Sequence, residues 1–344
     1  MCGREIKSCL SLLKDYIGRH QAEWDVYRVI GNPYDRVYTA PPHVPHENGT
    51  EYRVPASRAF YKLTEIIRST PFLAAEVLRD RPLRCAYTGE APGSFIEAVV
   101  SIRRRASIAC VDSDSHFGIS LKSDRRSVPH WKLGVGWMRA NGVKICRGAD
   151  GTGDLLRPNN VDSFVEACGG AGSCDIVTGD GGFDFSSDFN DQESQVLRLL
   201  AAECLVCLRL LAPGGVCVIK IFEAFGLETR NMIASFFGCF SDVDVLKPKT
   251  SRPGNSERYI VCGGFTGSEA GLYQAMVAAA AGNSSALSEL VPDPACLSRL
   301  EEANVKYGLR QIESILGTVD CMDRKDASGV VDLSKDWMSE FLVH

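Results

Sequence analysis

Short apolar runs alternate with longer stretches of helical periodicity through the middle of the chain. Apolar residues recur at helical spacing within 94–105, 191–211 and 224–238. The runs with the length and composition of strands are 83–88, 107–112, 143–147, 174–180, 215–222, 243–246 and 259–263. Because strands that alternate with helices form a mostly parallel sheet covered on both faces, this pattern predicts an α/β fold with a seven-stranded sheet.

The last predicted strand is expected to run antiparallel to its predecessor. Only the Pro/Gly/Ser-containing stretch 248–256 separates the two. A parallel pair requires a crossover connection, usually a helix, and none fits in so short a segment.

The segments that flank this alternating region differ in character. Residues 5–18 have the pattern of an amphipathic helix, and 31–56 have little periodicity and read as an extended lead-in. Ser57 predicts the start of a helix, and Pro71 the start of another. The tail from residue 268 shows helical periodicity, and we expect it to pack on the sheet, with a separate small domain as the alternative. The expected division is an N-terminal extension (1–56), a sheet domain (57–267) and a C-terminal helical extension (268–344).

Composition is that of an ordinary globular protein. Of the 344 residues, 45% are hydrophobic and 24% are charged, and the formal net charge is −5. These values argue against a disordered or fibrous chain. No apolar run approaches the ~20 residues that span a bilayer, and charges interrupt the first 20 positions, so neither a membrane span nor a signal peptide is expected. We therefore expect an intracellular, soluble protein.

The 14 cysteines are expected to be reduced, mostly small core residues. Cys204 and Cys207 form a CxxC pair, but it lies within an apolar helical pattern and has no second pair at zinc spacing. No metal site is predicted.

A glycine turn joins the first predicted strand to a helix and is a candidate cofactor loop. Its residues are Gly89, Glu90, Ala91, Pro92, Gly93, Ser94 and Phe95. Such a turn brings backbone N–H groups and a helix N-terminus close to an anionic ligand group. The dinucleotide pattern GxGxxG is absent, which favours a nucleoside with a carboxylate, such as S-adenosylmethionine.

Two further strand ends carry carboxylates that suit such a ligand. Asp112 ends the second predicted strand, 23 residues after Gly89, near the offset at which an acidic side chain takes ribose hydroxyls. Asp150 follows the third strand and could accept from an adenine amino group.

Asp180 and Lys220 are the candidate catalytic residues that the strand pattern itself supplies. Asp180 follows the fourth strand at the carboxyl edge of the sheet, where active groups gather. Lys220 interrupts an otherwise apolar strand, and a buried lysine with a lowered pKa can serve as a general base. The alternative is a lysine at a strand end that reaches solvent. Lys62 and Glu257 by themselves would be unremarkable surface charges.

Together, however, the sequence around these four residues resembles the FtsJ-like ribose 2′-O-methyltransferases. The stretches that carry the resemblance, in the expected order over residues 55–265, are SRAFYKL, GEAPGSF, DIVTGDGGFDFS, VIKIFE and SERYIV. Two more, within 118–132 and 148–156, resemble the branch directed to the mRNA cap, in large DNA viruses and in eukaryotes. The Gly181-Gly182-Phe183 that follows Asp180 departs from the Met-Ala-Pro of ribosomal-RNA members and also favours cap RNA.

The resemblance implies a Rossmann-like methyltransferase fold, S-adenosylmethionine as cofactor, and transfer of its methyl group to a ribose 2′-oxygen. It assigns Lys62, Asp180, Lys220 and Glu257 to a catalytic tetrad, with Lys220 as general base, Lys62 disfavouring its charged form, and Asp180 also beside the cofactor. It further implies the capped 5′ end of mRNA as substrate, other capping factors as partners, and a location in the nucleus for a cellular enzyme or in the cytoplasm for a viral one. The alternatives are ribosomal or transfer RNA as substrate, or a non-catalytic RNA-binding subunit of the same fold.

Basic side chains mark where RNA could lie. Although the chain is acidic overall, residues 101–147 hold ten basic and only three acidic side chains. Phosphate contacts supply affinity for RNA, and an aromatic ring can stack on a base. The candidates are Lys122, Arg125, Arg126, Trp131, Lys132, Lys249 and Arg252. A solvated basic loop is the alternative.

Overall fold

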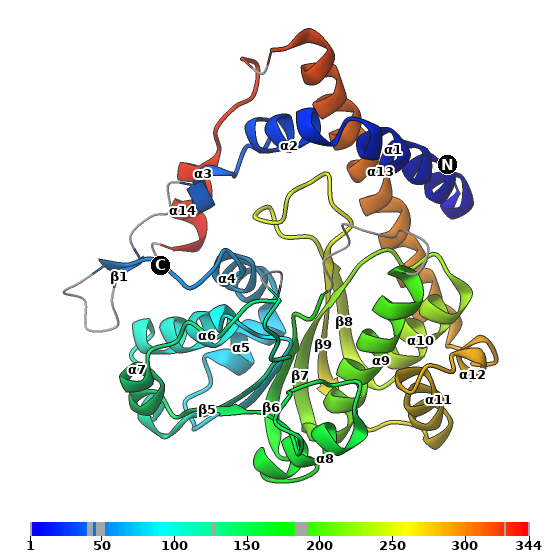
Figure 1. Ribbon diagram of the computed structural model, residues 1–344. Coiled ribbons are helices and arrows are strands. Elements are labelled where there is room, and N and C mark those ends of the chain that lie inside the picture. Colours follow the sequence, from blue (N-terminus) through cyan, green and yellow to red (C-terminus); the bar gives the residue numbers. More distant parts are fainter. Residues whose placement is uncertain are drawn as a thin grey trace.

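The computed structural model describes residues 2–39, 44–45, 52–125, 128–182, 192–326 and 328–342. Its centre is a seven-stranded sheet with the strand order β5-β4-β3-β6-β7-β9-β8 (Figure 1). The strands of this sheet are β3 (Arg84–Thr88), β4 (Ser115–Ile119), β5 (Val143–Cys146), β6 (Cys174–Gly179), β7 (Leu211–Ile221), β8 (Phe240–Leu246) and β9 (Arg258–Phe265). Two short segments, β1 (Val44–Pro45) and β2 (Tyr52–Arg53), pair separately.

Strand direction follows the expectation from the sequence. Strands β5, β4, β3, β6 and β7 are parallel to one another. The last strand in the chain, β9, lies between β7 and β8 and is antiparallel to both. The predicted α/β fold with a mostly parallel seven-stranded sheet and an antiparallel last strand is therefore confirmed.

Helices cover both faces because the buried strands are apolar on both sides. Alternate residues of one strand, such as Val216 and Cys217 of β7, belong to two different core clusters. One cluster contains residues of α8, α9, α10, α11, α12 and α13, and the other contains residues of α4, α5, α6 and α14. The bounds of the helices that follow the lead-in and cover the sheet are α4 (Ala59–Ser69), α5 (Pro71–Val77), α6 (Ser94–Arg105), α7 (Val135–Ala140), α8 (Pro158–Ala167), α9 (Gln192–Leu210) and α10 (Leu227–Phe237).

The two flanking extensions pack on each other and on this central unit. Helices α1 (Gly3–Arg19) and α2 (Gln21–Ile30) contact the long helix α13 (Pro294–Arg324), which also contacts α10. The short α3 (Arg36–Thr39) and the last helix, α14 (Ser334–Phe341), contact each other, and α14 lies beside α4 (Figure 1). The remaining helices of the tail are α11 (Ala270–Ala280) and α12 (Ser285–Ser288), beside α9 and α10. Within the described residues, no helix is both long and apolar enough to cross a membrane.

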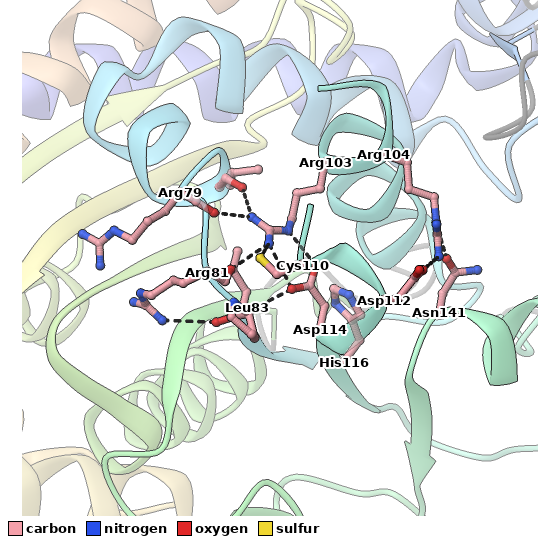
Figure 2. Close-up of polar contacts among 12 residues, drawn as sticks. Arg79, Arg81, Leu83, Arg103, Arg104, Cys110, Asp112, Asp114, His116 and Asn141 are labelled. Atoms are coloured by element: carbon pink, nitrogen blue, oxygen red, sulfur yellow. Dashed lines mark hydrogen bonds and ion pairs between the residues drawn. The ribbon is translucent and has the colours of Figure 1, made fainter. Parts of the chain in front are cut away.

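The predicted strand over 107–112 is wrong. Ser107 has φ 54° directly after α6, and 111–113 form a turn of 3₁₀ helix (η1, Val111–Ser113). The second strand is β4, whose start is held by a buried polar network (Figure 2). Its centre is Arg103, 0% exposed, which donates to Asp114 through Nε at 2.6 Å, while Asp114 also accepts from the backbone N–H of Leu83 at 2.8 Å. Because Asp114 is anchored beside the start of β3, pairing begins only at Ser115.

Cysteine packing agrees with the reduced state expected. All 14 cysteines are free, and eight of them, including Cys204 and Cys207, are buried. In the described part of the chain, no group of three or more His, Cys, Asp or Glu side chains is arranged to hold a metal ion.

Candidate active site

Lys220 and Asp180 meet at the carboxyl edge of two neighbouring parallel strands. Asp180 directly follows β6, and Lys220 is the penultimate residue of β7. The Lys220 Nζ lies 3.2 Å from Asp180 Oδ1 and donates to the backbone carbonyl oxygen of Asp180 at 2.6 Å. Tyr259, opposite Lys220 on β9, donates its hydroxyl to the same Oδ1 at 3.0 Å. Lys220 therefore does not reach freely into solvent; it is held against a carboxylate.

A second lysine–carboxylate pair lies beside the first. Lys62 on α4 places its Nζ 2.6 Å from Oε1 of Glu257, the residue before β9, and both side chains are nearly buried. Ser251 donates its hydroxyl to the same Oε1 at 2.8 Å. The structure thus brings all four residues of the expected tetrad to one region, from α4, the end of β6, β7 and the start of β9.

The charges of the two pairs act on one another. Burial by itself would raise the pKa of Glu257, but the charges of Lys62 and Lys220 outweigh it and hold that pKa at about 2. Burial would likewise lower the pKa of Lys220, but Asp180, Glu257 and Glu203 outweigh it and raise that pKa above its ordinary value. The expected lowered pKa of Lys220 is therefore wrong, because carboxylates surround this amine.

Glu203, a buried residue of α9, is part of this site, although sequence reasoning did not single it out. Its Oε1 accepts from the backbone N–H of Gly181 at 3.0 Å and from the hydroxyl of Thr88 at 3.1 Å. A Cβ on Gly181 would lie 2.6 Å from that oxygen, which explains the glycine after Asp180. Burial raises the pKa of Glu203 to about 7. A lone carboxylate in an otherwise apolar helical run was the available signal.

The candidate cofactor loop lies at the same edge of the sheet. Gly89 has φ +59°, and a Cβ there would lie 2.4 Å from Cα of Gly181, so β3 and β6 end with their backbones in contact. Gly93, with φ +112°, is the N-cap residue of α6, and a Cβ there would clash with Leu133. Ala91 and Pro92 are partly exposed between the two. Gly89 and Gly93 need to be glycine because their φ is positive and other chain segments approach them closely.

Three other residues of the loop face inward and have partners of their own. Glu90 is buried, and its Oε1 accepts from the backbone N–H groups of Phe95 at 2.6 Å and of Ile96 at 3.2 Å. It therefore caps α6, so the expectation that the helix N-terminus meets a ligand anion is wrong for these two donors. Ser94 contacts Ser57 through the hydroxyls at 2.9 Å, and the ring of Phe95 is fully buried in the core.

Asp112 lies at the amino edge of the sheet, opposite to the carboxyl edge that carries the candidate cofactor loop. Because β4 starts at Ser115, Asp112 precedes the strand and lies at its amino end. Its carboxylate pairs with Arg104 at 2.9 Å and is largely exposed (Figure 2). The assignment of Asp112 to the cofactor site is therefore wrong, and the reason is the misplaced strand.

Asp150 follows β5 at the expected edge, but its carboxylate already has partners. The N–H and hydroxyl of Thr152 donate to Oδ1 at 2.9 and 2.6 Å, and Arg157 pairs with Oδ2 at 2.6 Å. These hydrogen bonds, foremost those of Thr152, hold the pKa of Asp150 below its ordinary value.

The candidate RNA-binding residues form two groups. Lys122, Arg125 and Lys132 are exposed on the segment after β4, and the N–H of Lys132 bonds to the carbonyl of Pro92 in the cofactor loop at 3.1 Å. Trp131 is partly buried, and its ring lies over Gly118 of β4, so it serves packing. Arg126 lies outside the described residues.

The second group lies in the segment before Glu257. Lys249 pairs with Glu340 of α14 at 2.7 Å, and its Nζ lies 5.3 Å from the ring centre of Phe341. Arg252 is half-buried, with Nε 4.0 Å from Asp35. Of the two, Lys249 is directed toward α14, where its charge is already matched.

Similarity to known proteins agrees with this geometry. The FtsJ-like methyltransferase family matches residues 55–265. The cap-specific mRNA (nucleoside-2′-O-)-methyltransferase 2 of Danio rerio is 29% identical over 221 residues, which are 60% of this chain and 28% of that protein. The cap-specific mRNA (nucleoside-2′-O-)-methyltransferase of Autographa californica nuclear polyhedrosis virus is 41% identical over 115 residues, 33% of this chain and 43% of that protein.

A third relative, cap-specific mRNA (nucleoside-2′-O-)-methyltransferase 1 of Trypanosoma brucei brucei, is 32% identical over 181 residues, 51% of this chain and 45% of that protein. The chain thus matches less than half the length of each of these three relatives. The family match, in contrast, covers more than half of this chain and contains the sheet and the four residues of the tetrad. The chain therefore belongs to the FtsJ-like methyltransferase family.

Proposed function

We propose that this chain transfers a methyl group from S-adenosylmethionine to the ribose 2′-hydroxyl of a nucleotide near the 5′ cap of mRNA. The observation that carries the proposal is the pair of buried lysine–carboxylate contacts, Lys220–Asp180 and Lys62–Glu257, at the edge of the sheet beside the cofactor loop. The names of the relatives support cap RNA as the substrate.

The residues at this edge fit a cationic cofactor. Glu90 and Glu203 are both buried, burial raises the pKa of each, and the charge of Asp180 adds to the rise. A bound sulfonium would lower these raised pKa values and favour the ionised carboxylates, whereas the negative charge of a diphosphate would raise them further. Gly182 keeps the space beside Lys220 open, because a Cβ there would lie 3.1 Å from its Nζ. Gly89, Gly181 and Asp180 would line the bound cofactor, which supplies an activated methyl group on a positively charged sulfur.

The chain's own residues must remove the proton from a weak nucleophile and hold it in line. We assign general-base catalysis to Lys220, whose amine would accept the proton of the 2′-hydroxyl as the new bond forms. Lys62, paired with Glu257, would hold the ribose oxygen. Asp180 orients Lys220 and balances positive charge, and alignment of the reactants supplies much of the acceleration.

Lys220 needs a neutral amine for this role, and the protein groups around it favour the ammonium form. A cation bound next to Asp180 would offset the carboxylates that hold the proton. Lys62 adds a second positive charge beside Glu257. We therefore expect Lys220 to become a base only when the cofactor is bound.

Methylation of short RNAs that differ only at the 5′ end tests the proposal. Purified protein with radiolabelled S-adenosylmethionine should methylate a capped oligonucleotide, and nuclease digestion should place the label on a 2′-oxygen. Equal transfer to the uncapped oligonucleotide, or a preference for ribosomal or transfer RNA, would contradict the cap assignment. Binding of RNA with no transfer to any of these would instead favour a non-catalytic subunit.

A further inference from the structure

Helix α14 is joined to the tetrad by hydrogen bonds and by the peptide bond between Thr250 and Ser251. It lies beside α4, although 272 positions separate Glu65 of α4 from Trp337 of α14 (Figure 1). Trp337 is 0% exposed, and its ring packs against Tyr61 at 5.7 Å between ring centres. Its indole Nε1–H donates to Oε2 of Glu65 at 2.8 Å.

Glu65 in turn holds the segment that precedes Glu257. Its Oε1 accepts from the backbone N–H of Lys249 at 2.5 Å, and its Oε2 accepts from the N–H and the hydroxyl of Thr250 at 3.1 and 2.9 Å. Glu65 is 5% exposed and Thr250 is 0% exposed. A buried carboxylate on α4 that accepts from four donors fixes the position of this helix relative to α14 and the segment 249–250, because each lost bond leaves the buried carboxylate less satisfied.

The fixed segment delivers a hydrogen bond to the tetrad. Ser251, the next residue after Thr250, is 2% exposed and donates to the Oε1 of Glu257 that Lys62 also contacts. Lys62 and Glu65 lie three residues apart on the same buried face of α4. One turn of this helix therefore carries both the lysine of the pair and the carboxylate that holds the segment 249–250.

We propose that Trp337 is a positioning residue that orients the Lys62–Glu257 pair through Glu65 and Ser251. The inference rests on the proposed function for its catalytic consequence, since it assigns to α14 a part in holding Lys62 where the ribose oxygen would lie. Trp337 touches neither substrate nor cofactor in this role. Loss of its N–H donor loosens the segment 249–251 and, with it, the position of the lysine.

Trp337→Phe tests this, because it keeps an aromatic ring in the core and removes only the donor and one ring. Catalysis depends steeply on placement, so kcat should fall by about tenfold while the KM for S-adenosylmethionine stays unchanged. Trp137→Phe on α7 is the matched control and should retain wild-type kcat. Glu65→Gln should reproduce the loss, and the double variant should be no worse than the more affected single variant, because both act on one series of bonds.

A readout that does not depend on turnover is the rate at which acetic anhydride labels the buried amine of Lys62, measured by mass spectrometry relative to the exposed Lys144. This rate should rise by about tenfold in Trp337→Phe, as expected for a loosened pair, and stay unchanged in Trp137→Phe. Should Trp337→Phe unfold, Glu65→Gln carries the same comparison. Wild-type kcat in a folded Trp337→Phe, or unchanged labelling of Lys62, would overturn the proposal. A wild-type protein without methyl transfer would count against the proposed function alone, and the labelling would still decide the positioning role.

Discussion

At the scale of single residues, Lys220 is the side chain on which methyl transfer should depend most. Lys220→Ala removes the amine and leaves the cofactor loop intact. Since general-base catalysis typically contributes 10²–10⁴-fold, we expect transfer to fall by at least about 100-fold. The affinity for S-adenosylmethionine, measured by calorimetry, should change little.

The exposed Lys144 on β5 provides the control, and Lys144→Ala should keep full activity. Near-normal transfer by purified Lys220→Ala would remove this residue from the role of base.

Glu203 makes folding stability depend on pH. Burial raises its pKa from 4.5 to about 7, so between these values the folded chain binds a proton that the unfolded chain has released. The stability that Glu203 contributes is therefore fully present below pH 4.5 and is lost as the pH rises through 7. A shift of this size corresponds to about 3 kcal/mol.

Urea unfolding at pH 5 and pH 8 measures this effect. Between pH 5 and pH 8, the free energy of unfolding should fall by about 3 kcal/mol less in Glu203→Gln than in the wild-type protein. The same pH dependence in both proteins would show that Glu203 is charged in the folded chain at pH 5.

At the scale of elements, the start of β4 depends on one buried ion pair. Asp114 accepts from Arg103 and from Leu83, and Arg103 also donates to the carbonyls of Val77, Arg79 and Arg81 (Figure 2). Breaking a buried pair leaves an uncompensated charge, so Asp114→Ala should lower the free energy of unfolding by roughly 3–5 kcal/mol.

Asp112 gives a matched comparison two residues away. Its pair with Arg104 is exposed, and such pairs contribute little. Asp112→Ala should leave both stability and the affinity for S-adenosylmethionine unchanged in thermal-shift and binding measurements. A marked loss of cofactor affinity would show that Asp112 reaches the cofactor after all.

Over the whole molecule, an acidic chain must bind RNA through a restricted surface. Of the two basic groups, the one formed by Lys122, Arg125 and Lys132 is exposed beside the cofactor loop. Lys122→Ala should therefore weaken binding of a short capped RNA and reduce the slope of log affinity against log salt concentration by about 1. Lys249→Ala should change that slope less, because Glu340 already matches its charge. A larger effect of Lys249→Ala would place the RNA over α14.

The sequence by itself determined the order and type of most elements of the sheet, and it predicted the four residues that the structure brings together as two lysine–carboxylate pairs. Short apolar runs such as 174–180 predict strands because a strand that is buried on both faces is apolar at nearly every position. Asp180 and Lys220 stand out because they are polar groups at the end of such a run or inside it. It misplaced the second strand because the pattern of 107–112 is locally as strand-like as that of β4. The contacts of Asp114 with Arg103 and Leu83, which form only in the folded chain, lie where β4 begins.

The tertiary structure alone decided which partners the charged groups have. Glu90 caps a helix, Glu203 joins two strand ends, and Trp337 reaches Glu65 across almost the whole chain. The direction in which the pKa of Lys220 moves was likewise decided by neighbours from three different elements. The physical reason is that strand and helix patterns arise from nearby residues, whereas electrostatics and hydrogen bonds between distant residues depend on distances that exist only after folding.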